Sequence, residues 1–303
     1  MSDAAAVRCE SCDAVLLAGD RFCEECGARA GDEPAVDEHV PDGREEVDLG
    51  WAAAVSDQGR VHHRNEDAFH LELAGDGIAA VVCDGISSAA SGDVAARTAA
   101  QAAGEALAAA LRAGASDLEA ATVAAVSAAG AAVGTVPMTV RSDAPVPSCT
   151  LVCATSIGGR LVIGWLGDSR AYWIGPDDAR QLTVDDSWAT DQVAAGLMSA
   201  EEAERDRRAH AITRWVGRDA PGGPPSVVVA TVEAPGRLIL CSDGVWNYAS
   251  SPRALATLVE RLPAEAAPAA VARTLADMAL ERGGHDNITA VVIDLAPSRE
   301  AAA

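Results

Sequence analysis

The sequence predicts an α+β fold, because its helical and strand-like segments come in groups instead of alternating. Short apolar runs typical of β-strands recur between residues 51 and 295. Two Ala-rich helical segments lie together in the middle of this region, and two more precede the final strand. This order favours helices layered on sheets over a doubly wound parallel sheet.

Each element follows from a local pattern. Apolar runs rich in Val, Ile and Leu predict strands over residues 51–55, 78–83, 148–155, 161–165, 170–174, 227–232, 237–241 and 287–295. Helical patterns predict helices over about 93–113, 117–133, 252–261 and 265–282. Aromatic residues make up only 3% of the chain while alanine is abundant, so the helices should pack through small side chains.

Composition excludes several partners. The 303 residues are 49% hydrophobic, enough to fill the core of one large domain or two ordinary ones. The formal net charge is -22 and lysine is absent, which argues against nucleic acid or an anionic membrane as partner. No uncharged apolar run reaches the roughly 18 residues of a membrane span, and the N-terminus lacks a signal-peptide pattern. We therefore expect a cytoplasmic protein.

Four of the eight cysteines form two knuckles at the N-terminus, Cys9-x2-Cys12 and Cys23-x2-Cys26. This spacing predicts one structural, tetrahedral Zn²⁺ in a ribbon over residues 1–30. A disulfide pair and a redox-active CxxC are the alternatives. The acidic, proline-containing stretch that follows predicts a flexible linker over 31–48, and a second domain over 49–296.

Three aspartates stand beside apolar strands: Asp84 in VVCDG, Asp243 in LCSDGVWN and Asp286 in GGHDNITAVVID. Strand ends on a rigid sheet can aim such side chains at one point. Carboxylates gathered without basic partners repel one another unless hard cations lie between them, and oxygen ligands suit Mg²⁺ or Mn²⁺. The pattern therefore indicates a hydrolase with two metal ions.

Six ordered segments extend this interpretation. They are SDQGRVHHRNEDAF (56–69), VVCDG (81–85), GDSRAY (167–172), LTVDDS (182–187), LCSDGVWN (240–247) and GGHDNITAVV (283–292). Together they resemble the signature blocks of the type-2C, metal-dependent (PPM) serine/threonine protein phosphatases. The resemblance covers roughly residues 49–296. It implies a four-layer αββα sandwich of two antiparallel sheets, with a binuclear Mg²⁺ or Mn²⁺ centre at one end.

The resemblance also implies roles for individual residues. Asp84 would bridge both ions, Asp243 and Asp286 would complete one site, and the Gly85 carbonyl would hold the second ion. Around that second ion, Glu66 and Asp67 would fix bound waters. Asp168 matches a third, weaker site of bacterial relatives, with a turn residue between two strands as the alternative. Attack by a water bridging the two ions would then hydrolyse phosphoserine and phosphothreonine in phosphorylated proteins, the targets of serine/threonine kinases.

Three positions depart from the family pattern. His62 stands where many relatives have an arginine that clamps the substrate phosphate, so a bidentate fork is replaced by a group that is cationic only at lower pH. Ile86 stands where eukaryotic relatives have a histidine proposed as general acid, and Asp186 replaces the histidine of the DHS variant. His63 or Arg64 could compensate for the lost arginine, and a surface role for both is the alternative.

Other functions stay open at this point. A phosphoprotein-binding pseudophosphatase would keep the scaffold without turnover, although the intact carboxylates argue against it. A phosphatase dedicated to one regulatory protein would have the same catalytic residues. The charged segment 187–225 matches the family's flap, where Arg205, Arg207, Arg208 or Arg214 could meet a phosphopeptide, or simply form surface ion pairs. The ribbon could recruit a protein partner through the flexible linker, or serve folding alone.

Overall fold

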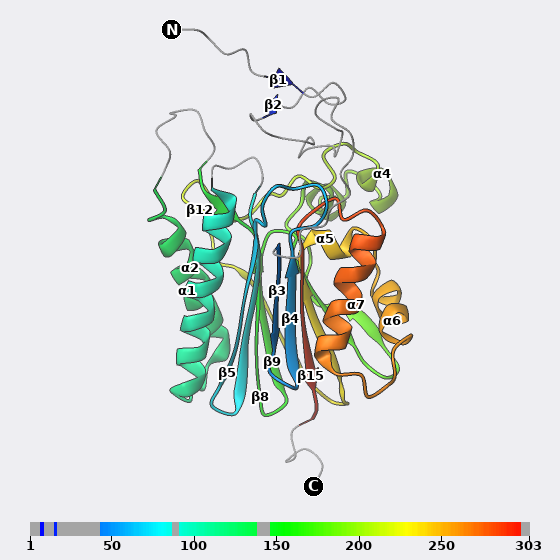
Figure 1. The fold of residues 1–303 in the computed structure, drawn as a ribbon. Coiled ribbons are helices and arrows are strands. Elements are labelled where there is room, and N and C mark those ends of the chain that lie inside the picture. The colour runs from blue at the N-terminus through cyan, green and yellow to red at the C-terminus, as the bar shows by residue number, and fades with distance from the viewer. Residues whose placement is uncertain (1–6, 9–14, 17–42, 87–90, 138–145, 298–303) are drawn as a thin grey trace.

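Two antiparallel sheets lie face to face, and helices cover their outer faces (Figure 1). The computed structural model describes residues 7–8, 15–16, 43–86, 91–137 and 146–297. Within these residues, the larger sheet has the strand order β11-β10-β14-β15-β4-β3 and the smaller one β13-β9-β8-β6-β5. All neighbouring strands in both sheets are antiparallel. The predicted α+β class with two antiparallel sheets is confirmed.

The strands of the larger sheet are β3 (Arg44–Asp48), β4 (Ala52–Asp57), β10 (Arg170–Ile174), β11 (Ala179–Gln181), β14 (Gly236–Cys241) and β15 (Ile288–Leu295). Those of the smaller sheet are β5 (Asp67–Ala74), β6 (Gly77–Asp84), β8 (Leu151–Ile157), β9 (Arg160–Leu166) and β13 (Ser226–Thr231). Two further pairs are short: β1 (Val7–Arg8) with β2 (Val15–Leu16), and β7 (Ser148–Cys149) with β12 (Val216–Gly217).

The helices are α1 (Gly92–Arg112), α2 (Leu118–Val133), α3 (Trp188–Ala194), α4 (Ala200–Glu204), α5 (Asp243–Trp246), α6 (Pro252–Val259) and α7 (Pro268–Glu281). Pro252 and Pro268 stand in the first turns of α6 and α7, where the missing amide hydrogen has no helical partner to lose. None of the described helices is both long and apolar enough to cross a membrane.

Three buried layers hold the sandwich together. The first lies between the smaller sheet and the alanine-lined faces of α1 and α2, the second between the two sheets, and the third between the larger sheet and α5 to α7. In the first layer, α1 buries six alanines, and a Cβ on its Gly104 would collide with the His70 ring of β5. Small side chains therefore let this helix approach the sheet closely, as the composition predicted.

The first strand of the larger sheet overlaps the segment predicted as linker. Strand β3 (REEVD) has one apolar residue and pairs with β4 from Arg44 to Asp48. Ion pairs with α7 also hold it: Arg44 Nη1 lies 2.7 Å from Asp277 Oδ1, and Arg273 Nε lies 2.7 Å from Glu46 Oε2. Hydrophobic periodicity does not register a charged edge strand of this kind. The cysteines Cys9, Cys12, Cys23 and Cys26 lie outside the described residues.

Candidate active site

The predicted carboxylates meet at one end of the sandwich, the end where α5 lies (Figure 1). Asp67 begins β5 and Asp84 ends β6, and the two residues are direct partners in the ladder. Asp243 follows β14 as the first residue of α5, and Asp286 lies two residues before β15, which pairs with β14. Asp168 lies between β9 and β10. Antiparallel neighbours thus bring five separate parts of the sequence to one edge.

Glycines after two of these aspartates permit the close approach. A Cβ on Gly85 would overlap the backbone of Gly92 at the start of α1, and a Cβ on Gly244 would collide with the Asn287 carbonyl. The Asp-Gly pairs at 84–85 and 243–244 are therefore needed for packing as well as for the carboxylates. They bring Asp84 to the start of α1 and Asp243 to the loop that carries Asp286.

Buried carboxylate oxygens in the cluster lack hydrogen-bond partners within the described structure. Asp67 Oδ2 accepts a 2.7 Å hydrogen bond from Ser242 Oγ, whereas Asp67 Oδ1 is buried and accepts none. Asp243 Oδ2 accepts from Asn247 Nδ2 at 3.2 Å, whereas its Oδ1 is likewise unsatisfied. Buried polar atoms of this kind are costly, so these two oxygens are suited to a ligand.

The raised pKa values of these aspartates also indicate a site suited to a ligand. Burial, opposed by hydrogen bonds from Ser242 and Thr289 and reinforced by the charge of Asp286, raises the pKa of Asp67 to about 7. Burial and the neighbouring aspartates raise the pKa values of Asp84 and Asp243 well above the ordinary range. Burial and the nearby Asp185 raise the pKa of Asp168 to about 7. Only a nearby positive charge would make full ionisation of this cluster favourable.

The donor set fits a hard divalent cation in its chemistry: carboxylate oxygens, two of them buried and unsatisfied, in a site that penalises their negative charge. In the described part of the chain, however, no three His, Cys, Asp or Glu side chains form a group that could hold an ion by themselves. The carboxylates converge on one region without closing around a single point. Backbone oxygens and water would have to complete any coordination shell.

His62 and Glu66 lie beside the cluster. The buried His62 ring places Nε2 3.3 Å from Asp286 Oδ1, whose side chain is 38% exposed. Glu66 is buried, and its Oε1 lies 2.6 Å from Arg64 Nε. Arg64 is therefore engaged with Glu66. Asn287 accepts from the Glu66 backbone nitrogen and donates to the carbonyls of residues 58 and 64, so it fixes this loop.

Two hydroxyl residues that sequence reasoning missed position the aspartates. Besides its bond to Asp67, Ser242 Oγ accepts from the Thr289 nitrogen at 3.0 Å. Thr150 Oγ1 accepts from the Asp84 nitrogen at 3.1 Å and bonds with Ser169 Oγ at 2.7 Å, which links Asp84 to the neighbour of Asp168. Their signal in the sequence was weak: a Ser directly before Asp243 and a Thr within the apolar run 148–155.

Asp185 and Asp186, the two acids of LTVDDS, contact residues on either side of Asp168 in the sequence. Asp185 makes a bidentate pair with Arg170, with contacts of 2.9 and 2.7 Å, and that guanidinium lies 3.7 Å from the Trp246 ring centre. Asp186 Oδ2 accepts from the Gly167 nitrogen at 3.0 Å, and its Oδ1 accepts from Arg214 Nη1 at 3.2 Å. Asp186 therefore joins the flap to the segment that carries Asp168.

Other flap arginines also have partners. Arg214 donates further to Ser226 Oγ at 3.1 Å and to the Pro224 carbonyl. Arg205 pairs with Glu201 at 2.6 Å, and Arg208 pairs with Asp206 at 2.9 Å while stacking over Trp188. Arg207 is exposed, and no ion pair of its own is found in the described residues. The alternative of surface ion pairs therefore fits Arg205 and Arg208, whereas the contact of Arg214 with Asp186 is largely buried.

The fold class of this chain is an α+β sandwich of two antiparallel sheets with an acidic cluster at one end. Within that class, the family model of Protein phosphatase 2C matches residues 58–279, so the chain belongs to the protein phosphatase 2C family. The family named from the sequence motifs is confirmed.

Individual relatives are bacterial. The chain is 32% identical over 147 residues to serine/threonine protein phosphatase PstP of Mycobacterium tuberculosis, a match over 48% of this chain and 27% of that protein. It is 26% identical over 240 residues to serine/threonine phosphatase stp of Listeria welshimeri, covering 79% of this chain and 93% of that protein. This chain therefore matches only about a quarter of the length of PstP.

Solved structures share the fold. The M. tuberculosis phosphatase PstP/Ppp superposes with a TM-score of 0.67 at 29% identity, over 81% of this chain and 98% of that one. A structure of the PstP catalytic domain in complex with 2 manganese ions gives a TM-score of 0.59 at 27% identity, over 80% of this chain and 96% of that one. A Streptococcus agalactiae serine/threonine phosphatase, at 22% identity and a TM-score of 0.70 over 80% and 98% of the two chains, supports the fold alone.

Proposed function

We propose that this protein is a metal-dependent serine/threonine phosphatase that hydrolyses phosphoserine and phosphothreonine in phosphorylated proteins. The observation that carries the proposal is the convergence of Asp67, Asp84, Asp243 and Asp286 at one end of a protein phosphatase 2C fold, with buried, unsatisfied oxygens on Asp67 and Asp243. A cluster that penalises negative charge this strongly favours hard cations. The names of the relatives support the reaction class.

Two Mn²⁺ or Mg²⁺ ions would be held by Asp84 between them, by Asp243 and Asp286 on one side, and by the Gly85 carbonyl on the other. When bound, such a pair activates a water for in-line attack and neutralises charge on the phosphoryl oxygens. Glu66 and Asp67 would orient waters at the second site. Asp168 would supply a third and weaker site; its neighbours Gly167 and Arg170 are held by Asp186 and Asp185.

Several side chains of this protein would do the positioning. Ser242 donates to one oxygen of Asp67, and the other oxygen is buried without a hydrogen-bond partner. His62 takes the place of the phosphate-clamping arginine; its Nε2 lies at Asp286, so a protonated ring could donate to a phosphoryl oxygen there. Ile86 donates no proton, so water or His62 would protonate the leaving oxygen.

The N-terminal region completes the proposed organisation: a zinc ribbon with four cysteine ligands over 1–30, a linker over 31–48 and the phosphatase domain over 49–296. The antiparallel pairing of β1 with β2, which flank the first knuckle in the sequence, supports this proposal. Because residues 44–48 form strand β3, the linker would end before residue 44. The ribbon would recruit a protein partner and raise its effective concentration near the carboxylates.

Hydrolysis of a phosphothreonine peptide by the full-length protein tests the proposed reaction. Turnover should require added Mn²⁺ or Mg²⁺, stop on chelation and disappear in Asp243→Ala. The Cys9→Ser, Cys12→Ser variant should lose bound zinc and keep hydrolysis of a small aryl phosphate. If metal binds and no phosphopeptide or aryl phosphate is hydrolysed, the protein is a binder of phosphoproteins and the proposal is wrong.

A further inference from the structure

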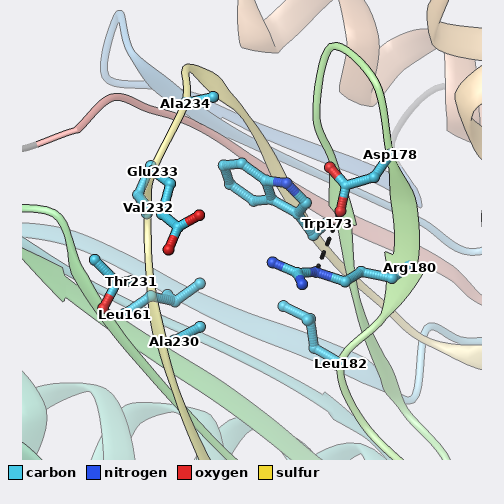
Figure 2. Close-up of a pocket in the computed structure, with 10 residues that line it drawn as sticks. All are labelled: Leu161, Trp173, Asp178, Arg180, Leu182, Ala230, Thr231, Val232, Glu233 and Ala234. Carbon is cyan, nitrogen blue, oxygen red and sulfur yellow. Dashed lines mark ion pairs between the residues drawn. The ribbon is translucent and has the colours of Figure 1, made fainter.

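A pocket opens at one edge of the sandwich, far from the carboxylates. It has a volume of about 220 Å³ and lies between the ends of β9 and β13 in one sheet and of β10 and β11 in the other (Figure 2). Leu161 starts β9, whereas Asp168 follows the end of that strand, so nearly the full strand separates the pocket from the cluster. At about 3.3 Å per residue that is roughly 20 Å. A ligand here would leave the carboxylates untouched.

The interior of this edge pocket is apolar and its mouth is charged. Leu161, Trp173 and Val232 are almost fully buried, and Leu182 and Ala230 are partly exposed on the walls. Figure 2 shows Glu233 on one side of the mouth and the Asp178–Arg180 pair, 3.5 Å apart, on the other, with the Trp173 ring between them. An empty volume of this size exceeds the roughly 150 Å³ that accommodates benzene, so it holds one large apolar side chain.

The strand beside the pocket has a free edge. Within the described sheets, β13 has a hydrogen-bonded neighbour, β9, on one side only. Its sequence, SVVVAT, contains no charged residue, and the Val229 side chain is 40% exposed. Native proteins usually protect edge strands with charge, proline or a covering element. Here those protections are absent from the strand itself, so its main chain is open to an added strand.

Charge at the mouth indicates the chemistry of the occupant. Two exposed carboxylates, Asp178 and Glu233, line the mouth together with one guanidinium, that of Arg180, which already pairs with Asp178. The whole chain carries a net charge of -22. A second copy of this acidic chain would bring like charges together, whereas a basic segment would be attracted.

We propose that the edge pocket and the free edge of β13 form a docking site for an extended, basic segment of another protein, which adds as a strand and inserts one apolar side chain between Leu161 and Trp173. Main-chain hydrogen bonds along β13 supply part of the affinity, and the apolar anchor together with basic residues beside Glu233 supplies selectivity. The site goes beyond the proposed phosphatase reaction, and binding is measurable without turnover.

Two fluorescent peptides test the proposal against full-length protein: acetyl-Ser-Arg-Val-Leu-Val-Arg-Ser-amide, and the same peptide with serine in place of leucine. Because the two peptides carry the same charge, a difference between their affinities reports burial of the leucine and not general attraction to an acidic protein. Burying the leucine should make the first peptide bind about tenfold tighter by fluorescence anisotropy. Ala230→Phe, which fills the pocket from β13, should abolish that difference, and Glu233→Lys should weaken both peptides.

The matched control is Asp76→Lys, which makes the same charge reversal at an exposed turn on the opposite edge of the same sheet. It should leave both affinities within about twofold of the wild type. Equal binding of the two peptides to wild-type protein, or an unchanged preference in Ala230→Phe, would overturn the proposal. Sedimentation of the wild type as a dimer that Ala230→Phe dissociates would also overturn it, because a second copy would then cover the edge.

Discussion

Asp67 should make the stability of the metal-free protein fall as pH rises. Its pKa is raised from an ordinary value of 3.8 to about 7, chiefly by burial, so the folded state holds a proton that the unfolded chain releases. Between these two values the native state binds more protons than the unfolded state, and unfolding becomes easier with each step upward in pH. The stabilisation is complete below about pH 4 and lost above about pH 7.

The size of this effect on the free energy of unfolding follows from the pKa shift of Asp67. About three pKa units at 1.36 kcal/mol each give an upper limit of about 4 kcal/mol for Asp67 alone, and coupling to the other aspartates will divide it. Asp67→Asn removes this titration and keeps an oxygen that can accept from Ser242 Oγ. In chelator, the variant should therefore match the wild type near pH 4 and exceed it by about 1–3 kcal/mol near pH 8.

Urea unfolding followed by circular dichroism, in chelator at both pH values, measures this difference. Asp76→Asn, at an exposed turn, serves as the control and should follow the wild type at both. Excess Mn²⁺ should narrow or reverse this difference in stability, because the variant should hold the second ion less tightly than the wild type. A wild type equally stable at both pH values, or a variant no more stable than it near pH 8, would refute the reasoning.

Three further predictions concern neighbouring contacts. Ser242→Ala should lower the free energy of unfolding by about 2–3 kcal/mol, because it leaves the buried Thr289 nitrogen without its acceptor; Ser242→Thr, which keeps the hydroxyl, should recover part of this in urea titrations. Arg214→Lys should raise the KM for a phosphopeptide and loosen the flap, since an ammonium cannot reach Asp186, Ser226 and Pro224 together; an unchanged KM and unchanged proteolysis of the flap would contradict this. His62→Arg should tighten inhibition by inorganic phosphate about tenfold near pH 7.5, and equal inhibition would mean that residue 62 does not contact phosphate.

Apolar periodicity predicted the central strands well because both of their faces are buried. Strand β10 lies at the residues predicted for it, and β14 and β15 differ by one residue at an end. Strand β5 was missed, since its sequence DAFHLELA mixes polar and apolar residues along an edge strand that packs against α1. The four-residue α5 was also missed, because it depends on the close contact of Gly244 with the Asn287 backbone.

In the candidate site too, some residues could be predicted from the sequence and others could not. Aspartates at strand ends could be found from sequence, because antiparallel pairing brings such ends together. Partners that depend on side-chain geometry could not. The replacement of histidine by Asp186 had no evident consequence in the sequence, whereas the structure shows its carboxylate bonded to Gly167 and Arg214. Arg64, considered as a substitute phosphate ligand, is instead paired with Glu66.

We propose above that Asp84, Asp243 and Asp286 hold a pair of divalent ions. Anomalous diffraction at the manganese edge, from crystals of the full chain grown with Mn²⁺, tests it directly. We expect two adjacent anomalous peaks at the end of the sandwich where α5 lies, with Asp84 contacting both and at least one peak lost in Asp243→Ala. Anomalous density elsewhere, with none among these carboxylates, would contradict it.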